Sequence, residues 1–265
     1  MLTSSKVHPY FWAPSHGFGF STNFGDELMA RVFEFLSGQT LEWSQAGTYD
    51  RSLFIGGSVI DMARDGDVVW GAGVRDFATP MHFRQNLKVY SVRGPLSRHF
   101  LLMRGVECPQ IYGDPGILVP ELYPEFLSVE RTIARGIIPH YSEYEQTLER
   151  FGHESGTRVI DPRRPAREVV GDIARCQSVG ASSLHGIIVA EALGISVFWW
   201  RESNQEPFYK YYDYYLSTDR AADPLADLAM GFAKLEVQRN EPIDFSGQIR
   251  GLKESFAKLQ NDCVF

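Results

Sequence analysis

The sequence predicts an α/β fold in which two Rossmann-like domains face each other across a cleft. Short apolar runs that end in glycine, arginine or aspartate alternate with stretches of helical period, which is typical of parallel sheets covered by helices. The alternation stops at a polar, proline-bearing stretch, residues 120–130, and then restarts. For a chain of 265 residues we therefore expect a first domain over 1–125, a second over 126–240, and a C-terminal helix over 241–265 that can pack back on the first domain.

Composition excludes several classes of protein. Hydrophobic residues make up 44% and charged residues 22% of the chain, as in ordinary globular proteins. A net charge of −7 argues against a nucleic-acid partner, because binding to phosphates requires a basic surface. No apolar run is long enough for a transmembrane helix, and the three cysteines lack metal-binding spacing. We expect a cytoplasmic protein with reduced cysteines and without a resident metal or cofactor.

Five apolar runs of the first domain are expected as strands, namely residues 7–12, 52–58, 68–75, 88–93 and 110–119. A loop that contains Gly17 and Gly19 follows the first run and leads to Asn23 and Asp26. Either of these two side chains can cap the helix that begins there, and glycine lets the backbone approach a ligand. A simple capped loop explains the same residues. None of the turns has the G-x-G-x-x-G pattern, so a dinucleotide is not indicated.

The second domain is expected to consist of strands 134–140 and 157–161, helices 143–151 and 165–176, and a strand-turn-helix unit within residues 178–200. In that unit Ser182 and Ser183 precede a helix whose first turn carries His185. The free N–H groups of such a helix can bind an anion, beside which His185 could transfer a proton. Alternatively, one serine is only a helix cap and His185 is a buried structural imidazole.

The candidate site residues all lie at the ends of expected strands or beside the first helix of a domain. Carboxyl ends of parallel strands meet at one edge of a sheet, so these side chains should converge. Asp26 and His185 would face each other as base and acid. Arginine can bind phosphate or carboxylate with two hydrogen bonds, although Arg163 and Arg164 could equally be solvated surface charges. The expected binding residues are Asn23, Gly25, Arg75, Arg93, His140, Arg163, Arg164, Ser182, Ser183, Leu184 and Gly186.

Six motifs occur in a fixed order along the chain. They are Asn-Phe-Gly-Asp-Glu-Leu from residue 23, Ile-Gly-Gly-Ser from 55, Trp-Gly-Ala-Gly from 70, Ser-Val-Arg-Gly-Pro-Leu-Ser from 91, Gly-Asp-Pro-Gly-Ile-Leu from 113 and Ser-Ser-Leu-His-Gly from 182. In this order they resemble the polysaccharide pyruvyltransferase family, in particular its bacterial, exopolysaccharide ketal-forming branch of the succinoglycan-ketolase-like type. The resemblance covers about residues 7–200.

The resemblance implies a fold similar to the B-type glycosyltransferases and a metal-independent reaction. Family members transfer the pyruvate unit of phosphoenolpyruvate onto two hydroxyls of a sugar, which gives a ketal and phosphate. The family's histidine falls on His185 as general acid, and its early Asn-x-Gly-Asp loop falls on Asn23, Gly25 and Asp26 on the acceptor side. Many members have an arginine where this chain has Ser183. Arg163, Arg164 or His140 would then have to supply the positive charge for the donor.

The implied partners are phosphoenolpyruvate and a sugar acceptor, either lipid-linked or an oligosaccharide repeat unit. A lipid-linked acceptor would bring the protein to the inner face of the membrane as a peripheral protein. Two other functions remain open, since a fold alone does not set the chemistry. The chain could be a glycosyltransferase that uses a nucleotide sugar, or a non-catalytic carbohydrate-binding protein. Tyrosines crowded into residues 208–215 could bind a sugar or serve packing.

Overall fold

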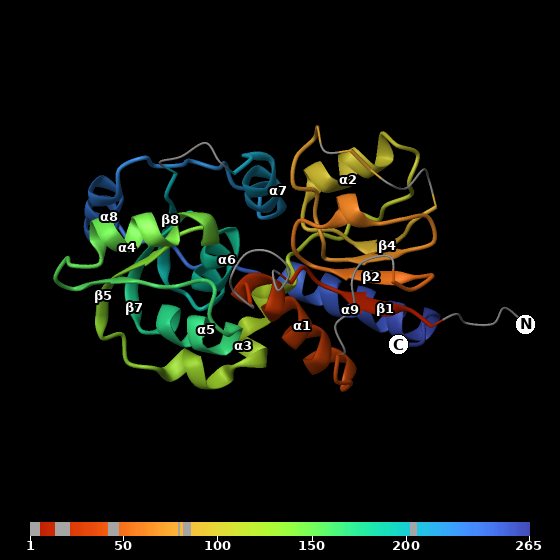
Figure 1. Cartoon of the computed structure of the whole chain (residues 1–265), viewed down its shortest axis with the longest axis horizontal. Helices are drawn as coiled ribbons and strands as arrows, with labels where there is room; N and C mark the ends of the chain where they lie inside the picture. Colours follow the sequence, from red (N-terminus) through yellow and green to blue (C-terminus); the bar gives the residue numbers. More distant parts are fainter. Residues whose placement is uncertain (1–5, 14–21, 42–47, 79, 82–85, 202–205) are drawn as a thin grey trace, which may run out of the picture.

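The computed structural model describes residues 6–13, 22–41, 48–78, 80–81, 86–201 and 206–265, so Gly17 and Gly19 lie outside the described residues. Within these residues the strands form two four-stranded parallel sheets (Figure 1). The expected α/β class is therefore confirmed. The first sheet has the order β1 (His8–Tyr10), β2 (Ser52–Ile55), β3 (Val68–Trp70), β4 (Lys88–Ser91). The second contains β5 (Ile133–Ile138), β6 (Thr157–Val159), β7 (Cys176–Ala181) and β8 (Ser196–Trp199).

Capping groups set the ends of the helices in the first half. The Asn23 side chain accepts a hydrogen bond from the Gly25 N–H and begins α1 (Phe24–Ser37), which ends at Gly38 in the left-handed region. Pro95 occupies the first position of α2 (Pro95–Leu102), where its missing N–H costs nothing. The short 3₁₀ helix η1 (Ile60–Met62) lies between β2 and β3.

The expected strand over residues 110–119 is wrong. Tyr112 forms only an isolated bridge with Val92, and the chain then turns into the 3₁₀ helix η2 (Pro115–Leu118). Proline cannot donate to a sheet, and the Asp114 side chain accepts the Gly116 N–H, which favours the turn. The polar, proline-bearing stretch around residues 120–130 also forms helical turns, α3 (Val119–Leu122) and η3 (Pro124–Ser128).

The second sheet has the strand order β6-β5-β7-β8, so successive connections leave β5 in opposite directions. Such a switch point is where open α/β sheets bind ligands, outside the carboxyl ends of the two central strands. Here those strands are β5 and β7, which end at the paired residues Ile138 and Ala181. The helices of this half are α4 (Tyr144–Phe151), α5 (Ala166–Ala174), α6 (Leu184–Ala192), α7 (Tyr209–Ser217) and α8 (Leu228–Val237), with the 3₁₀ turn η4 (Tyr141–Glu143) before α4.

The last helix, α9 (Ser246–Asp262), lies against the first sheet (Figure 1). The indole N–H of Trp70 in β3 donates to the Leu252 carbonyl and the Ser255 hydroxyl of α9. Phe256 packs edge-on against the same indole ring. The residues after α9 also contact the first half, since the Val7 N–H donates a hydrogen bond to the Val264 carbonyl. The domain boundaries at residues 125 and 240 stay a prediction.

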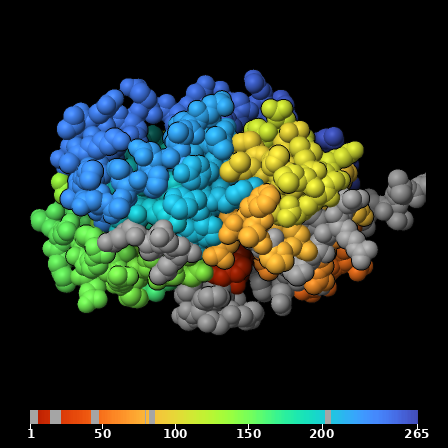
Figure 2. All heavy atoms as spheres, turned by 90° about the horizontal axis from the view of Figure 1, so that it is seen from above, coloured from red at the N-terminus to blue at the C-terminus, as the bar shows by residue number. Residues whose placement is uncertain are grey.

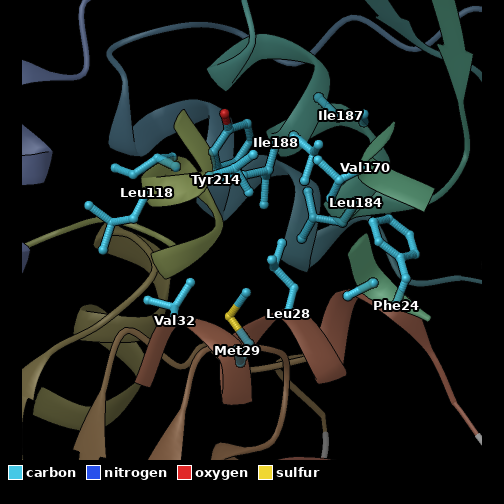
Figure 3. Packing of buried hydrophobic residues seen from close by; sticks show 14 of the residues in the cluster. Phe24, Leu28, Met29, Val32, Leu118, Val170, Leu184, Ile187, Ile188 and Tyr214 are labelled. Atoms are coloured by element: carbon cyan, nitrogen blue, oxygen red, sulfur yellow. The ribbon is translucent and has the colours of Figure 1, made fainter. Parts of the chain in front are cut away.

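One hydrophobic cluster joins the two halves. Leu28 and Met29 of α1 point toward Leu184 and Ile188 of α6 (Figure 3), and all four belong to a buried cluster that extends through both halves. Burial of each large apolar side chain contributes about 1.5–3 kcal/mol, so α1 and α6 hold each other firmly. The B-type arrangement of two separate domains stays a prediction.

The described residues add two further observations. Cys108, Cys176 and Cys263 are each buried and unpaired, as the sequence predicts. No helix in the described part of the chain has both the length and the apolar character needed to cross a membrane.

Candidate functional site

A pocket of about 300 Å³ lies where the carboxyl ends of the two sheets meet. Viewed from above, red atoms near the start of α1 are visible between the green and orange surfaces of the two halves (Figure 2). Gly57 and Ser58 after β2, and Arg75 after β3, line the pocket from the first half. Eight residues expected from the sequence line it: Asn23, Asp26, Arg75, Arg93, His140, Ser183, Leu184 and His185.

His185 stands in the first turn of α6, directly after the cap. The Ser183 side chain accepts the Gly186 N–H at 3.3 Å, so Ser183 is the helix cap. The His185 ring packs against Gly25 at the start of α1, where an added Cβ would lie 1.9 Å from the ring Nδ1. Only glycine permits this approach. Gly25 is therefore what brings the first turn of α1, with Asp26, against the first turn of α6.

Two carboxylates surround the His185 imidazole. The Asp114 Oδ2 lies 3.7 Å from the His185 Nε2, and the Asp114 side chain is fully buried. Burial lowers the pKa of His185, but Asp114 and then Asp26 outweigh it, so that the pKa is raised above 6.5. Burial also raises the pKa of Asp26 to about 6, although His185 and Lys210 oppose it. This group therefore places an imidazole whose pKa is raised beside a carboxylate that titrates close to neutrality.

Asp114 was not among the residues that the sequence singled out. Its Gly-Asp-Pro-Gly motif indicates a turn, and one carboxylate oxygen does cap that turn. Among the described residues, neither the Asp114 Oδ2 nor the His185 Nε2 has a hydrogen-bond partner at normal distance. A buried carboxylate oxygen that faces an imidazole nitrogen indicates a role beyond the turn.

His140 carries no charge near neutral pH. Burial and then Lys210 lower its pKa to about 4. The ring Nε2 lies 3.4 Å from a Glu206 carboxylate oxygen and the Nδ1 lies 2.8 Å from the Ser142 hydroxyl. A carboxylate beside Nε2 favours the tautomer with the proton there. His140 can therefore donate a hydrogen bond, but it does not supply the positive charge that the sequence left open.

Positive charge at the pocket comes from α7 and from the first sheet. Lys210 of α7 is 8% exposed and its ammonium group lies 2.5 Å from Glu206, while Arg75 lies 3.0 Å from the same carboxylate. Both Glu206 and Lys210 line the pocket. Apart from their i, i+4 spacing, little in the sequence indicates these two residues, because a lysine inside a tyrosine-rich stretch is typical of a helix that serves packing.

Arg93 lines the pocket, and each of its side-chain nitrogen atoms already has a hydrogen-bond partner in the protein. Its side chain is fully buried and donates to Asp213, Ser58 and the Val74 carbonyl. The Asp213 carboxylate of α7 also accepts the N–H groups of Leu96 and Ser97 in the first turn of α2. The N-terminus of α2 therefore binds an internal carboxylate, and Figure 2 shows the cyan atoms of α7 against the yellow atoms of α2.

Arg163 and Arg164 lie outside the pocket lining, contrary to the expectation that they bind the donor. Arg163 pairs with Asp161 at 2.8 Å and Glu145 at 2.9 Å, and Arg164 pairs with Asp172. Nearby carboxylates after β6 and on α4 and α5 thus hold both guanidinium groups.

Three further expected residues do not line the pocket but contact the elements that form it. The Ser182 hydroxyl donates to Glu143 and accepts the His140 N–H, which joins the ends of β5 and β7. Gly186 packs against Ile138, where an added Cβ would have contacts of 3.1 Å. Gly25 contacts the His185 ring as described above.

The aromatic residues of the pocket are different from those expected. Tyr211 and Tyr214 of α7 are 1% exposed, and Tyr211 stacks on Trp199 with ring centroids 4.3 Å apart. The tyrosines of residues 208–215 thus serve mainly packing. Trp12 and Tyr141 line the pocket instead, with stacked rings whose centroids lie 5.6 Å apart.

Fold and pocket together define an α/β protein that gathers carboxylate, imidazole and cationic side chains where two parallel sheets meet. Within the described residues, no three His, Cys, Asp or Glu side chains are grouped as a metal site requires. The chain belongs to the polysaccharide pyruvyl transferase family, whose model matches residues 23–204. The matched range includes Asp26, Asp114, His140 and His185.

Two curated proteins are similar to the chain. The succinoglycan biosynthesis protein ExoV of Rhizobium meliloti (strain 1021) is 30% identical over 196 residues, which cover 71% of this chain and 58% of ExoV. The uncharacterized protein L143 of Acanthamoeba polyphaga mimivirus is 30% identical over 166 residues, 60% of this chain and 57% of L143. The chain thus matches less than two thirds of the length of either relative.

A solved structure shares the fold. The chain of an uncharacterized protein from Klebsiella pneumoniae superimposes with a TM-score of 0.52 at 12% identity, over 84% of this chain and 94% of that one. At this identity the likeness concerns the fold alone.

Proposed function

We propose that the protein transfers the pyruvyl unit of phosphoenolpyruvate to two hydroxyls of a sugar in an exopolysaccharide or its precursor. The observation that carries the proposal is the His185 imidazole between Asp26 and Asp114 on one wall of a pocket with cationic side chains. Family membership and the similarity to a succinoglycan biosynthesis protein support the same reaction class. The acceptor would be an oligosaccharide repeat unit, free or on a lipid carrier at the inner membrane face.

His185 would act as the general acid. The imidazolium gives its proton to the methylene carbon of the donor, and positive charge develops at the neighbouring carbon that bears the phosphate. The first sugar hydroxyl attacks that carbon and loses its proton to Asp26, whose pKa of about 6 suits a base near neutral pH. The carbon–oxygen bond to phosphate then breaks, and the second hydroxyl closes the ketal. Two hydroxyl protons leave and two are taken up, one by the new methyl group and one by the released hydrogen phosphate.

The acceptor would lie along Trp12 and Tyr141. Their stacked rings offer an apolar face with polar edges, which suits a sugar ring that has C–H groups on one face and hydroxyls around its rim. Asp26 and Asp61 line the same pocket and can accept hydrogen bonds from sugar hydroxyls.

His185→Gln tests the proposal directly. We expect release of phosphate from phosphoenolpyruvate in the presence of a glycan acceptor to fall by about 10²–10⁴-fold, because glutamine cannot deliver the proton. Mass spectrometry of the glycan would follow the pyruvyl group. His99→Gln is the matched control, since His99 is exposed on α2, away from the pocket, and should leave turnover unchanged. Near-normal turnover of His185→Gln would remove His185 as the acid.

Thermal unfolding distinguishes the proposal from a nucleotide-sugar glycosyltransferase. A ligand that binds the native state raises its apparent stability. We expect phosphoenolpyruvate to raise the Tm and UDP, GDP and CMP to leave it unchanged. A shift with a nucleotide alone would favour the glycosyltransferase, and a shift with glycan alone would favour a non-catalytic carbohydrate-binding protein.

A further inference from the structure

One carboxylate in the pocket, that of Glu206, contacts three nitrogen-containing side chains, which come from three different elements of the chain. The Glu206 oxygens lie 2.5 Å from the Lys210 ammonium, 3.0 Å from the Arg75 guanidinium and 3.4 Å from the His140 Nε2. Lys210 is on α7, Arg75 follows β3 of the first sheet, and His140 follows β5 of the second. The point at which they converge is therefore built by both halves of the fold.

The three nitrogen groups have the composition of an oxyanion site. Lysine and arginine bring two positive charges, neutral His140 brings an N–H donor, and Glu206 cancels one charge, so one positive charge remains. Arg93 behind them is neutralised by Asp213. Phosphate and carboxylate are the anions that such a set of donors binds most strongly.

The burial of Lys210 explains why a carboxylate is present. Lys210 is 8% exposed, and the side chains of Glu206 and His140 are 12% and 14% exposed. A buried ammonium group without a counter-charge is strongly destabilising. Burial lowers the pKa of Lys210, and Glu206 is the main group that opposes this. Without an anionic ligand, the Glu206 carboxylate is the counter-charge that contacts the buried ammonium group.

We propose that Arg75, His140 and Lys210 form the subsite for an anionic group of the donor, and that the Glu206 carboxylate occupies this subsite until the donor displaces it. That the anion belongs to phosphoenolpyruvate rests on the proposed function. The subsite lies in the same pocket as Ser183, the cap of α6. Donor binding and release of Glu206 are then one exchange of anions.

Isothermal titration calorimetry with inorganic phosphate and with phosphoenolpyruvate tests the exchange. In Glu206→Gln the internal competitor is gone, so we expect both anions to bind about tenfold more tightly. In Lys210→Gln one positive charge is lost, and we expect binding about tenfold weaker. Glu121→Gln is the matched control, because Glu121 pairs with Lys253 outside the pocket and its loss should leave both Kd values unchanged.

Two outcomes would overturn the proposal. Equal weakening in Glu206→Gln and Lys210→Gln would mean that Glu206 holds the cations in their binding positions. Unchanged binding in both would place the anion elsewhere. If Glu206→Gln does not fold, Glu206→Asp withdraws the carboxylate by one methylene, and tighter binding is expected there as well, with weaker binding counting against the exchange.

Inorganic phosphate separates this proposal from the proposed function. Tighter phosphate binding in Glu206→Gln, with no turnover of phosphoenolpyruvate by the unsubstituted protein, would support the subsite and reject the pyruvyl transfer. Turnover by the unsubstituted protein, with phosphate Kd and donor KM unaffected by Glu206→Gln, would support the transfer and reject the subsite.

Discussion

Two charged groups at the pocket shift the pKa of a histidine in opposite directions. In the acidic group, Asp114 and Asp26 raise the pKa of His185 against the effect of burial. In the cationic group, which consists of Arg75, His140, Lys210 and Glu206, burial and Lys210 lower the pKa of His140 to about 4. The identity of the neighbouring charges, more than the degree of burial, decides which imidazole is protonated. One pocket thereby holds one histidine whose pKa is raised and one whose pKa is lowered.

The two groups are also supported differently. The acidic group consists of Asp26 on α1, His185 on α6 and Asp114 at the start of η2. The apolar side chains of these three elements share one buried cluster. The cationic group depends on α7, which is attached to the first half through Asp213, Arg93 and the first turn of α2. A hydrophobic core thus supports the acidic group, and a buried ion pair supports the cationic group. Substitutions in each support should have distinguishable effects.

Asp213→Ala should have the largest effect on stability. The substitution leaves the fully buried Arg93 guanidinium without its carboxylate, and it leaves two N–H groups of α2 without their acceptor. We therefore expect the free energy of unfolding to fall by about 3–5 kcal/mol. Urea denaturation followed by circular dichroism measures this loss. Glu236→Ala, which breaks the exposed pair with Arg135, should cost less than about 1 kcal/mol. Similar losses in both variants would show that α7 is held mainly by its aromatic packing.

Asp114→Asn should reduce activity more than stability. Asparagine can still accept the Gly116 N–H, but it removes the charge that most strongly raises the pKa of His185. We expect the His185 pKa to fall in an NMR titration, and kcat/KM at neutral pH to fall by about 10–10²-fold, because the imidazole is then largely deprotonated. The acidic limb of the pH–rate profile, set by Asp26 near pH 6, should remain.

The control for this substitution is Asp244→Asn. Asp244 is an exposed aspartate that likewise accepts the N–H two residues further on, from Ser246. It should leave turnover and the His185 titration unchanged. A drop in kcat/KM in Asp114→Asn without any shift in the His185 titration would mean that Asp114 acts through the geometry of η2 alone.

Local patterns in the sequence predict most of the strands and the part of the site that follows them. The apolar runs before His140 and Ser182 do form β5 and β7, and the two ends meet as parallel pairing requires. The run over residues 110–119 contains the same kinds of residue, but Pro115 and the Asp114 side-chain cap turn its second half into η2. Proline and one side-chain hydrogen bond outweigh apolar character at that position.

The strand-end pattern predicts Arg75 and His140 of the cationic group, but it could not predict that these two residues meet Glu206 and Lys210, because nothing local connects the two pairs. Arg75 and Lys210 are 135 positions apart, and both contact Glu206 in a fold where Asp213 helps to attach α7 to α2. Arg163 shows the opposite case, since a strand-end arginine is held by Asp161 only two residues away. Charge in the sequence indicates which groups can bind an anion, but the pairing with nearby carboxylates decides which of them do so.

Lys210→Met sharpens the comparison of the two histidines with the smallest structural change. Lys210 lowers the pKa of both imidazoles, but it is the second largest cause for His140 and the last for His185. We therefore expect both pKa values to rise in an NMR titration of the ring protons, with the larger shift at His140. Lys253→Met, in the pair outside the pocket, should shift neither. Equal pKa shifts at both histidines would mean that the acidic and cationic groups share a single electrostatic environment. The pKa of His185 would then change with any anion that enters the pocket.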